Sequence, residues 1–185
     1  MPKVIATEEQ WIDEGLRRFA RGGPDALVVE QMAQALGCSK SSFYWYFRDR
    51  ATLLSRIVEE WQRRATLQVM DSSSREASLN EAVLSLLKSL FASTGKGDFL
   101  FYLRRLALEE ETYRRLLEEV ERTRLDYVSG LLTRSGLSPE RAALKSHLLY
   151  HYYLGWYERH KEKTLTEDEM MQQVRMVWKE FIENE

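Results

Sequence analysis

The sequence predicts an all-α protein: an N-terminal three-helix head with a helix-turn-helix, joined by a long helix to a larger C-terminal helical body. Three observations support this fold class. The 185 residues include only three prolines and nine glycines, too few for a β architecture that turns often. Apolar side chains recur every three or four residues along most of the chain, which is the period of an amphipathic helix. Residues 29–47 have the order helix, glycine turn, helix.

The first helix of the head is predicted to begin after Thr7. The Thr7 hydroxyl and the Gln10 side chain have the spacing of a capping box, which satisfies amide groups at a helix start. The inner face of this helix consists of Ile12, Leu16, Phe19 and Ala20. The segment Gly22-Gly23-Pro24 then ends the helix.

Two short helices are predicted next, over residues 28–36 and 40–46. One face of the first of them carries Val29, Met32, Ala33 and Leu36 at helical spacing. Gly37 follows, as expected of a residue that takes a left-handed conformation without steric cost. Phe43 and Phe47 are four residues apart and return to the same core. This is the pattern of a helix-turn-helix.

The other side chains around the third helix are predicted to face outward, because they have nothing apolar to pack against. The hydroxyl of Ser39 can cap this helix. The outward groups form hydrogen bonds and are partly cationic, which suits the major groove of DNA and the phosphates beside it. The expected DNA-contacting residues are Ser39, Lys40, Ser41, Ser42, Tyr44, Tyr46 and Arg50.

A long helix over residues 49–70 is predicted to close the head and to continue into the body. The polar residues 71–76 follow it and mark a break. Further helices are expected at residues 79–93, 99–109, 112–134, 138–161 and 166–182. On this basis residues 1–50 form the DNA-binding head and residues 51–185 form the body.

Residues 32–47, MAQALGCSKSSFYWYF, resemble the helix-turn-helix of the TetR family of bacterial transcriptional repressors. The Leu-x-x-Phe-Ala pattern at residues 16–20 resembles the first helix of that family. Two features differ from the family pattern. Leu27 and Val28 stand where the family usually has Thr or Ser at the start of the second helix, and Tyr46 stands where it often has His.

The resemblance implies a dimeric regulator that binds double-stranded operator DNA through the third helix of each head. It also implies a small-molecule site, so residues 51–185 are expected to form an effector-binding and dimerisation domain. The main hypothesis is a repressor that a ligand releases from a palindromic operator. The alternative is a helical protein–protein adaptor that has lost DNA binding. No motif supports an enzyme, and no catalytic residue, metal site or cofactor is expected.

Aromatic side chains gather in the middle of the body, which favours a hydrophobic or aromatic effector. Each ring taken alone could instead fill a core. The candidate ligand-binding residues are Trp61, Phe99, Tyr102, Leu106, Tyr113, Leu116, Tyr127, His147, Tyr150 and His151. His147 and His151 have the spacing of metal ligands, but a core or interface pair fits them better because no catalytic glutamate lies between them.

The two C-terminal helices are apolar on more than one side, so a small body has too little interior to bury both. Packing against the same pair in a second copy would form an isologous four-helix interface. The expected interface residues are Leu148, Tyr152, Gly155, Val174, Val177, Trp178 and Phe181. An ordinary core within one chain is the alternative.

Charge and cysteine content restrict the partners and the compartment. The net charge is −2, and residues 1–70 carry ten basic and nine acidic side chains, so non-specific affinity for DNA should be weak. Cys38 is the single cysteine, which excludes an intrachain disulfide and fits a reducing cytoplasm. The sequence shows no signal peptide and no apolar run long enough to cross a membrane, so a cytoplasmic protein is expected.

Overall fold

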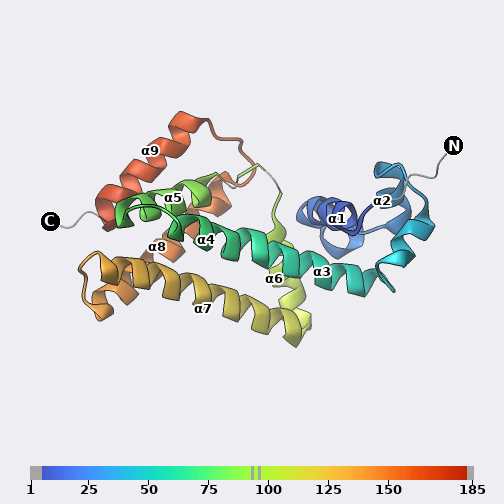
Figure 1. Cartoon of the computed structure of the whole chain (residues 1–185), viewed down its shortest axis with the longest axis horizontal. Coiled ribbons are helices and arrows are strands. Elements are labelled where there is room, and N and C mark those ends of the chain that lie inside the picture. The colour runs from blue at the N-terminus through green and yellow to red at the C-terminus, as the bar shows by residue number, and fades with distance from the viewer. Residues whose placement is uncertain (1–5, 93, 96, 183–185) are drawn as a thin grey trace. The chain divides into compact units, whose positions relative to one another are not determined.

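The computed structural model describes residues 6–92, 94–95 and 97–182, and within them it contains helices and no strands (Figure 1). The predicted all-α fold is therefore confirmed. The chain divides into two compact units: Met1–Arg64 with Gly97–Arg114, and Ala65–Lys96 with Arg115–Glu185. None of the described helices combines the length and the apolar composition needed to span a lipid bilayer.

The first unit contains the head. Its helices are α1 (Glu8–Gly22), α2 (Val29–Ala35), α3 (Arg50–Gln62) and α6 (Phe99–Glu109), with 3₁₀ helices at Gly23–Ala26 and Lys40–Trp45. The predicted capping box is present, because the Gln10 amide donates to the Thr7 hydroxyl at 3.2 Å and the Thr7 amide donates to Gln10 Oε1 at 2.8 Å. The largest fully buried side chains of this unit are Trp11, Phe19, Leu27, Met32, Phe43, Phe47, Leu53, Ile57 and Leu103.

Helix α6 packs within the first unit, although the sequence analysis assigns it to the body. The rings of Phe99 and Phe19 lie 4.5 Å apart between centroids. The chain enters α6 through Gly97, whose φ is +90°, and a Cβ at this position would lie 2.5 Å from the Ala20 carbonyl oxygen. Helical periodicity identifies an amphipathic helix but not the core that buries it. The functional division into residues 1–50 and 51–185 stays a prediction.

The long helix predicted over residues 49–70 is present and extends further. It consists of α3, a π turn at Arg63–Leu67, and α4 (Gln68–Ser74). The break predicted at residues 71–76 is therefore wrong in its first part. Ser73 is fully buried and its hydroxyl donates to the Ala82 carbonyl at 2.6 Å, so a serine typical of turns is held inside the helix by a tertiary contact.

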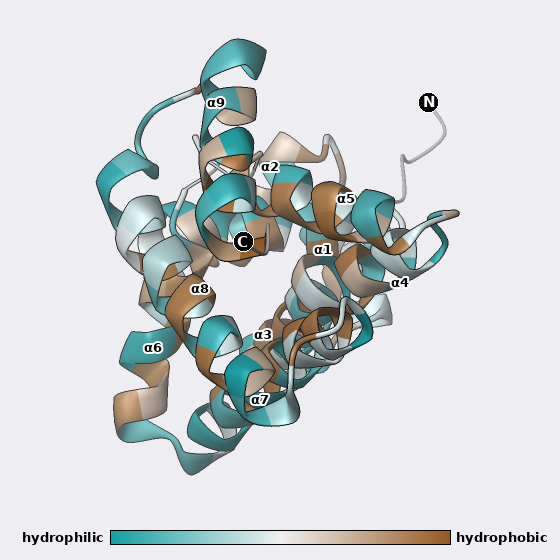
Figure 2. Ribbon diagram, turned by 90° about the vertical axis from the view of Figure 1, so that its left-hand side faces the viewer, coloured by the Kyte–Doolittle hydropathy of each residue, from teal (hydrophilic) through white to brown (hydrophobic). Residues whose placement is uncertain are grey.

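The second unit contains the body. Its helices are α4, α5 (Leu79–Phe91), α7 (Glu111–Arg134) from Arg115 onward, α8 (Pro139–His160) and α9 (Glu167–Val177), with a π turn at Trp178–Ile182. Helix α5 is mainly hydrophobic, whereas α7 alternates between hydrophilic and hydrophobic residues (Figure 2). The buried core includes Val83, Leu86, Leu87, Phe91, Leu131, Leu132, Leu149, Trp156, Val174 and Val177.

Candidate DNA interface and body cavity

The turn of the helix-turn-helix has the geometry that its sequence predicts. Gly37 has a φ of +64°, which is the left-handed region that glycine adopts without strain. The following amide, of Cys38, donates to the Ala33 carbonyl at 3.0 Å and closes the end of α2. The next helical segment, Lys40–Trp45, is a 3₁₀ helix. The turn thereby fixes the direction in which this segment leaves α2.

Two phenylalanines anchor this segment to the core of the head. Phe43 and Phe47 are each 1% exposed, with ring centroids 5.2 Å apart. The ring of Trp11 packs edge-on against Phe43 at 5.4 Å. These contacts confirm the predicted burial of both rings. The side chains between them are held in a defined position because their backbone is anchored on both sides.

Ser42 does not face outward, so the prediction that its side chain is exposed beside the other candidate DNA contacts is wrong. Its side chain is buried, and its hydroxyl accepts from the Trp11 indole N–H at 3.4 Å and donates to the Ala6 carbonyl at 3.4 Å. A buried indole N–H needs an acceptor, and Ser42 supplies it. This serine therefore stabilises the head.

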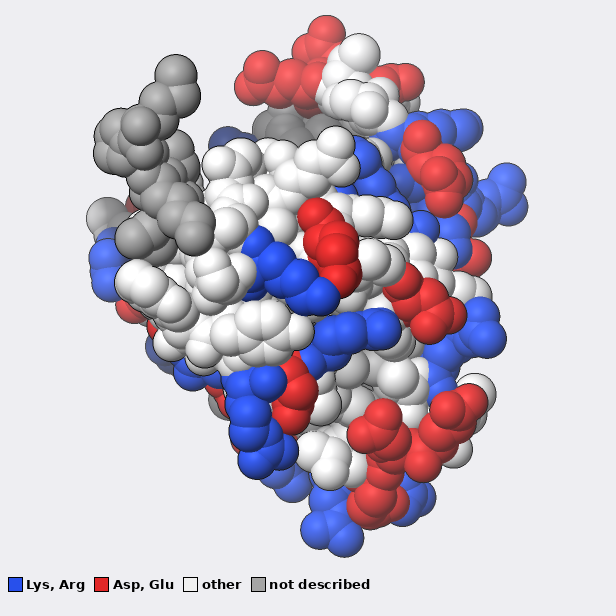
Figure 3. Space-filling view, turned by 90° about the vertical axis from the view of Figure 1, so that its right-hand side faces the viewer, with Lys and Arg blue, Asp and Glu red and all other residues white. Residues whose placement is uncertain are grey.

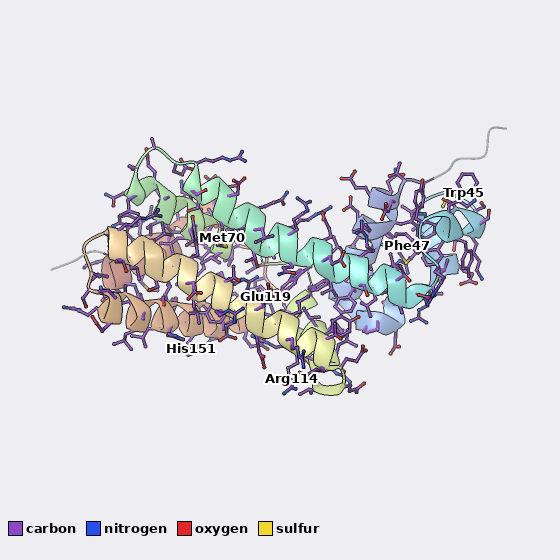
Figure 4. All side chains as sticks on the ribbon, turned by 60° about the horizontal axis from the view of Figure 1, so that its bottom comes forward. Trp45, Phe47, Met70, Arg114, Glu119 and His151 are labelled. Atoms are coloured by element: carbon purple, nitrogen blue, oxygen red, sulfur yellow. The ribbon has the colours of Figure 1, made fainter. Side chains whose placement is uncertain are left out.

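The surface of the segment is more aromatic than the sequence analysis expects. Tyr44 is 56% exposed, Trp45 69% and Tyr46 38%. Figure 4 shows Trp45 directed outward and Phe47 directed into the head. Trp45 was absent from the expected DNA contacts, yet its position midway between the anchors Phe43 and Phe47 places it on the opposite side of the helix. Together these exposed side chains form a surface that we call the reading surface, which consists of Lys40, Ser41, Tyr44, Trp45 and Tyr46.

The positive charge of the reading surface is partly neutralised. The Lys40 ammonium forms an ion pair with the Glu30 carboxylate, and both side chains are exposed. This hydrogen bond lowers the pKa of Glu30 and raises the pKa of Lys40. Basic and acidic side chains are interspersed over the face drawn in Figure 3, without one continuous basic patch. A phosphate that approaches Lys40 must therefore compete with Glu30.

The residues beside the reading surface are tied to the backbone. Arg50 is exposed and donates to the Pro24 carbonyl at 2.8 Å, which connects the start of α3 to the 3₁₀ helix that follows α1. Asp49 caps α3 by accepting from the Thr52 amide at 2.8 Å, and these hydrogen bonds lower the pKa of Asp49 to about 2. The hydroxyls of Ser39 and Ser41 are 2.7 Å apart. Ser39 and Arg50 thus remain near the reading surface, in supporting positions.

The body contains an apolar cavity of about 50 Å³ that opens to the surface. The residues that line it come from the long helix, α5, α7 and α8, and they are Ala65, Thr66, Val69, Met70, Leu86, Leu90, Arg124, Leu125, Tyr127, Val128, Ser146, Leu149, Tyr150 and Tyr153. Two of the ten expected ligand residues, Tyr127 and Tyr150, are among them. Sequence reasoning missed Arg124, the one charged residue among the described residues of the lining.

The other expected ligand residues lie elsewhere. Trp61, Phe99, Tyr102, Leu106 and Tyr113 belong to the first unit, where the rings of Trp61 and Phe99 stack at 5.1 Å. Leu116 belongs to the second unit but does not line the cavity. His147 and His151 are exposed on α8, so they are not the core pair that was one alternative. Aromatic content thus marks the core of the head as well as the cavity, and sequence alone does not separate them.

The expected dimer residues fall into two groups. Val174 and Val177 are fully buried in the chain's own core, so they offer no surface to a partner, and Trp178 and Phe181 pack against that core. The ring of Tyr152 lies 5.7 Å from that of Phe181.

The second group is exposed on α8. Leu148 is 50% exposed and Gly155 is also exposed. Leu144, which is 62% exposed and lies four residues before Leu148, extends the same stripe. We call Leu144, Leu148 and Gly155 the α8 stripe. Leu148 and Gly155 are the residues of the expected interface that are exposed in the single chain, and Leu144 adds to them a residue that was not expected.

Known proteins share this architecture. Residues 12–57 match the model for bacterial regulatory proteins of the tetR family. The HTH-type transcriptional regulator AcrR of Shigella flexneri is 25% identical over 131 residues, which cover 68% of this chain and 52% of AcrR. The HTH-type transcriptional repressor Rv1474c of Mycobacterium tuberculosis is 29% identical over 106 residues, which cover 54% of this chain and 51% of the repressor. The chain thus spans about half the length of the curated relatives it matches.

The fold is shared over a longer stretch than the sequence. The transcriptional regulator FadR from Bacillus subtilis, solved in complex with stearoyl-CoA, superposes with a TM-score of 0.64 at 16% identity. The match covers 95% of this chain and 98% of that one. The family match falls on the helix-turn-helix whose turn, anchors and reading surface are described above. This part of the chain is therefore similar to the bacterial regulatory proteins of the tetR family, and the chain as a whole shares its fold with the Bacillus subtilis regulator.

Proposed function

We propose that the chain is a transcriptional repressor that binds a palindromic operator as a homodimer and is released by a small hydrophobic or aromatic ligand. The reading surface carries this proposal. Lys40, Tyr44 and Trp45 are exposed on a segment whose backbone is fixed by buried Phe43 and Phe47. A rigid element that presents hydrogen-bonding and cationic side chains is what the major groove of DNA requires.

Two further observations support the homodimer and the effector. The α8 stripe is an exposed apolar surface, and a second copy would cover it in an isologous contact. The apolar cavity of the body supports an effector site, and FadR, a protein of similar fold, is seen with stearoyl-CoA. At about 50 Å³ the cavity is too small for a ligand of ten heavy atoms, so the lining side chains must move apart when such a ligand binds.

Binding to DNA fragments that flank the protein's own gene tests the proposal. Lys40→Ala should weaken binding and flatten the dependence of log affinity on log salt by about one unit, because one phosphate-contacting cation is lost. Tyr44→Phe removes one exposed hydroxyl and should weaken binding by about three- to tenfold. Neither change should lower the melting temperature, because both side chains are exposed.

Lys88→Ala is the matched control, since Lys88 is an exposed lysine on α5. It should bind DNA as the wild type does. If the wild-type protein gives no salt-dependent shift with any fragment, the repressor proposal fails and the adaptor alternative is favoured. Wild-type affinity in both Lys40→Ala and Tyr44→Phe would contradict the assigned contacts.

The ion pair between Glu30 and Lys40 leads to a second prediction. Glu30→Gln should raise the affinity for DNA by about two- to fivefold at low salt, because Lys40 is freed and a carboxylate near the phosphates is removed. The salt dependence should become steeper. A mobility-shift titration at three salt concentrations measures both quantities, with Glu76→Gln, an exposed acid outside the head, as the control. Weaker binding of Glu30→Gln would show that Glu30 positions Lys40 for DNA.

A further inference from the structure

The polar side chains of α7 that line the cavity are attached to the long helix. The Arg124 guanidinium donates through Nε to the Thr66 hydroxyl at 3.0 Å and through Nη2 to the Ala65 carbonyl at 3.2 Å. One turn further along α7, the Tyr127 hydroxyl donates to the Met70 carbonyl at 3.0 Å. Met70 is marked on α4 in Figure 4. Two side chains of α7 thus hold the long helix by its backbone beside the cavity.

The contacts of Arg124 fall on the irregular part of that helix. Ala65 and Thr66 belong to the π turn at Arg63–Leu67. A π turn interrupts the regular series of helical hydrogen bonds, and such turns occur often at functional sites. Arg124 donates to a carbonyl within this interruption. The π turn also contains the boundary between Arg64 and Ala65, where the helix passes from one compact unit to the other.

The chemistry of the lining favours one class of ligand. Its side chains are mostly apolar, and among its described residues there is no Asp or Glu to oppose a negative charge. Arg124 is partly buried there, which strengthens its interaction with an anion relative to an exposed arginine. The planar guanidinium matches a carboxylate, with which it forms paired hydrogen bonds.

We propose that the cavity binds an apolar monocarboxylate whose head group is held by Arg124, and that this contact draws the guanidinium away from the π turn. This inference rests on the proposed effector site in the body. It adds the class of ligand and the way in which ligand binding changes the long helix. A carboxylate competes with the Ala65 carbonyl and the Thr66 hydroxyl for the same N–H groups. The π turn then loses its cross-helix donors, and its geometry changes in the helix that leads to the head.

Octanoate and 1-octanol provide a matched pair of probes, because they share a chain and differ in charge. Titration calorimetry on the full chain should show octanoate binding about tenfold more tightly than 1-octanol, since one charged hydrogen-bonded contact is added. In Arg124→Gln the two affinities should become equal. Octanoate, but not 1-octanol at the same concentration, should lower the affinity of the wild-type protein for its DNA fragment, and Arg124→Gln should lose this effect.

Arg122→Gln is the control, because Arg122 is an exposed arginine on the same helix, and it should retain the preference for octanoate. Arg124→Lys keeps the charge without the paired donors, so it should retain part of the preference for octanoate over 1-octanol. This variant tests the role of Arg124 if Arg124→Gln fails to fold. If both probes bind the wild type equally well, Arg124 does not bind the carboxylate, but the proposed effector site still stands. Binding of neither probe, with DNA binding intact, overturns this inference and leaves the DNA-binding part of the proposed function standing.

Discussion

Replacing Phe43 by alanine is expected to lower the free energy of unfolding by about 3–5 kcal/mol and to abolish binding to operator DNA. Phe43 is 1% exposed and contacts the rings of Trp11 and Phe47, so its removal leaves a cavity directly beneath the reading surface. Urea denaturation followed by circular dichroism, together with a mobility-shift titration, measures both effects.

Tyr44→Ala is the matched control for Phe43→Ala. Tyr44 is the next residue in the chain but is 56% exposed. Its replacement should weaken DNA binding by about tenfold and change the free energy of unfolding by less than about 1 kcal/mol. Comparing Phe43→Ala with Tyr44→Ala distinguishes a side chain that contacts DNA from one that supports the DNA-contacting segment from below. A Phe43→Ala protein with wild-type stability would contradict the anchoring role of this ring.

Most helix boundaries could be predicted because their signals are local. Thr7, Ser138 and Thr166 each cap a helix in the structure, as their hydroxyls and the following sequence indicate. The assignment of α6 to a unit could not be predicted in this way. It depends on Phe99 reaching Phe19, a contact between residues far apart in the sequence. Periodicity gives the apolar face of a helix but not its partner.

The candidate sites could likewise be predicted only where they depend on local spacing and not on contacts between residues far apart in the sequence. The positions of Phe43 and Phe47 follow from their spacing, whereas the burial of Ser42 follows from the indole N–H of Trp11, which comes from another helix. Arg124 could not be identified from the sequence, because α7 carries many charged side chains that face solvent. What distinguishes Arg124 is its contact with the π turn of the long helix, and no sequence pattern predicts that π turn.

Leu148→Glu is expected to convert the proposed homodimer into a monomer. Leu148 is 50% exposed at the centre of the α8 stripe, between Leu144 and Gly155. In an isologous interface the change places two carboxylates in a desolvated surface, which costs several kcal/mol. The monomer retains one head and so loses the second half-site contact, which should reduce operator affinity by about 10²–10⁴-fold. Sedimentation velocity at micromolar concentration and a mobility-shift titration test these two outcomes.

Leu108→Glu is the control that isolates the interface. Leu108 is 87% exposed on α6, so the same substitution there adds the same charge without entering the α8 stripe. It should leave both the sedimentation coefficient and the operator affinity unchanged. Leu148 is already half-exposed in the single chain, so Leu148→Glu should retain the helical circular dichroism spectrum of the wild type. A Leu148→Glu protein that still sediments as a dimer would contradict an interface at the α8 stripe and would place it elsewhere on the chain.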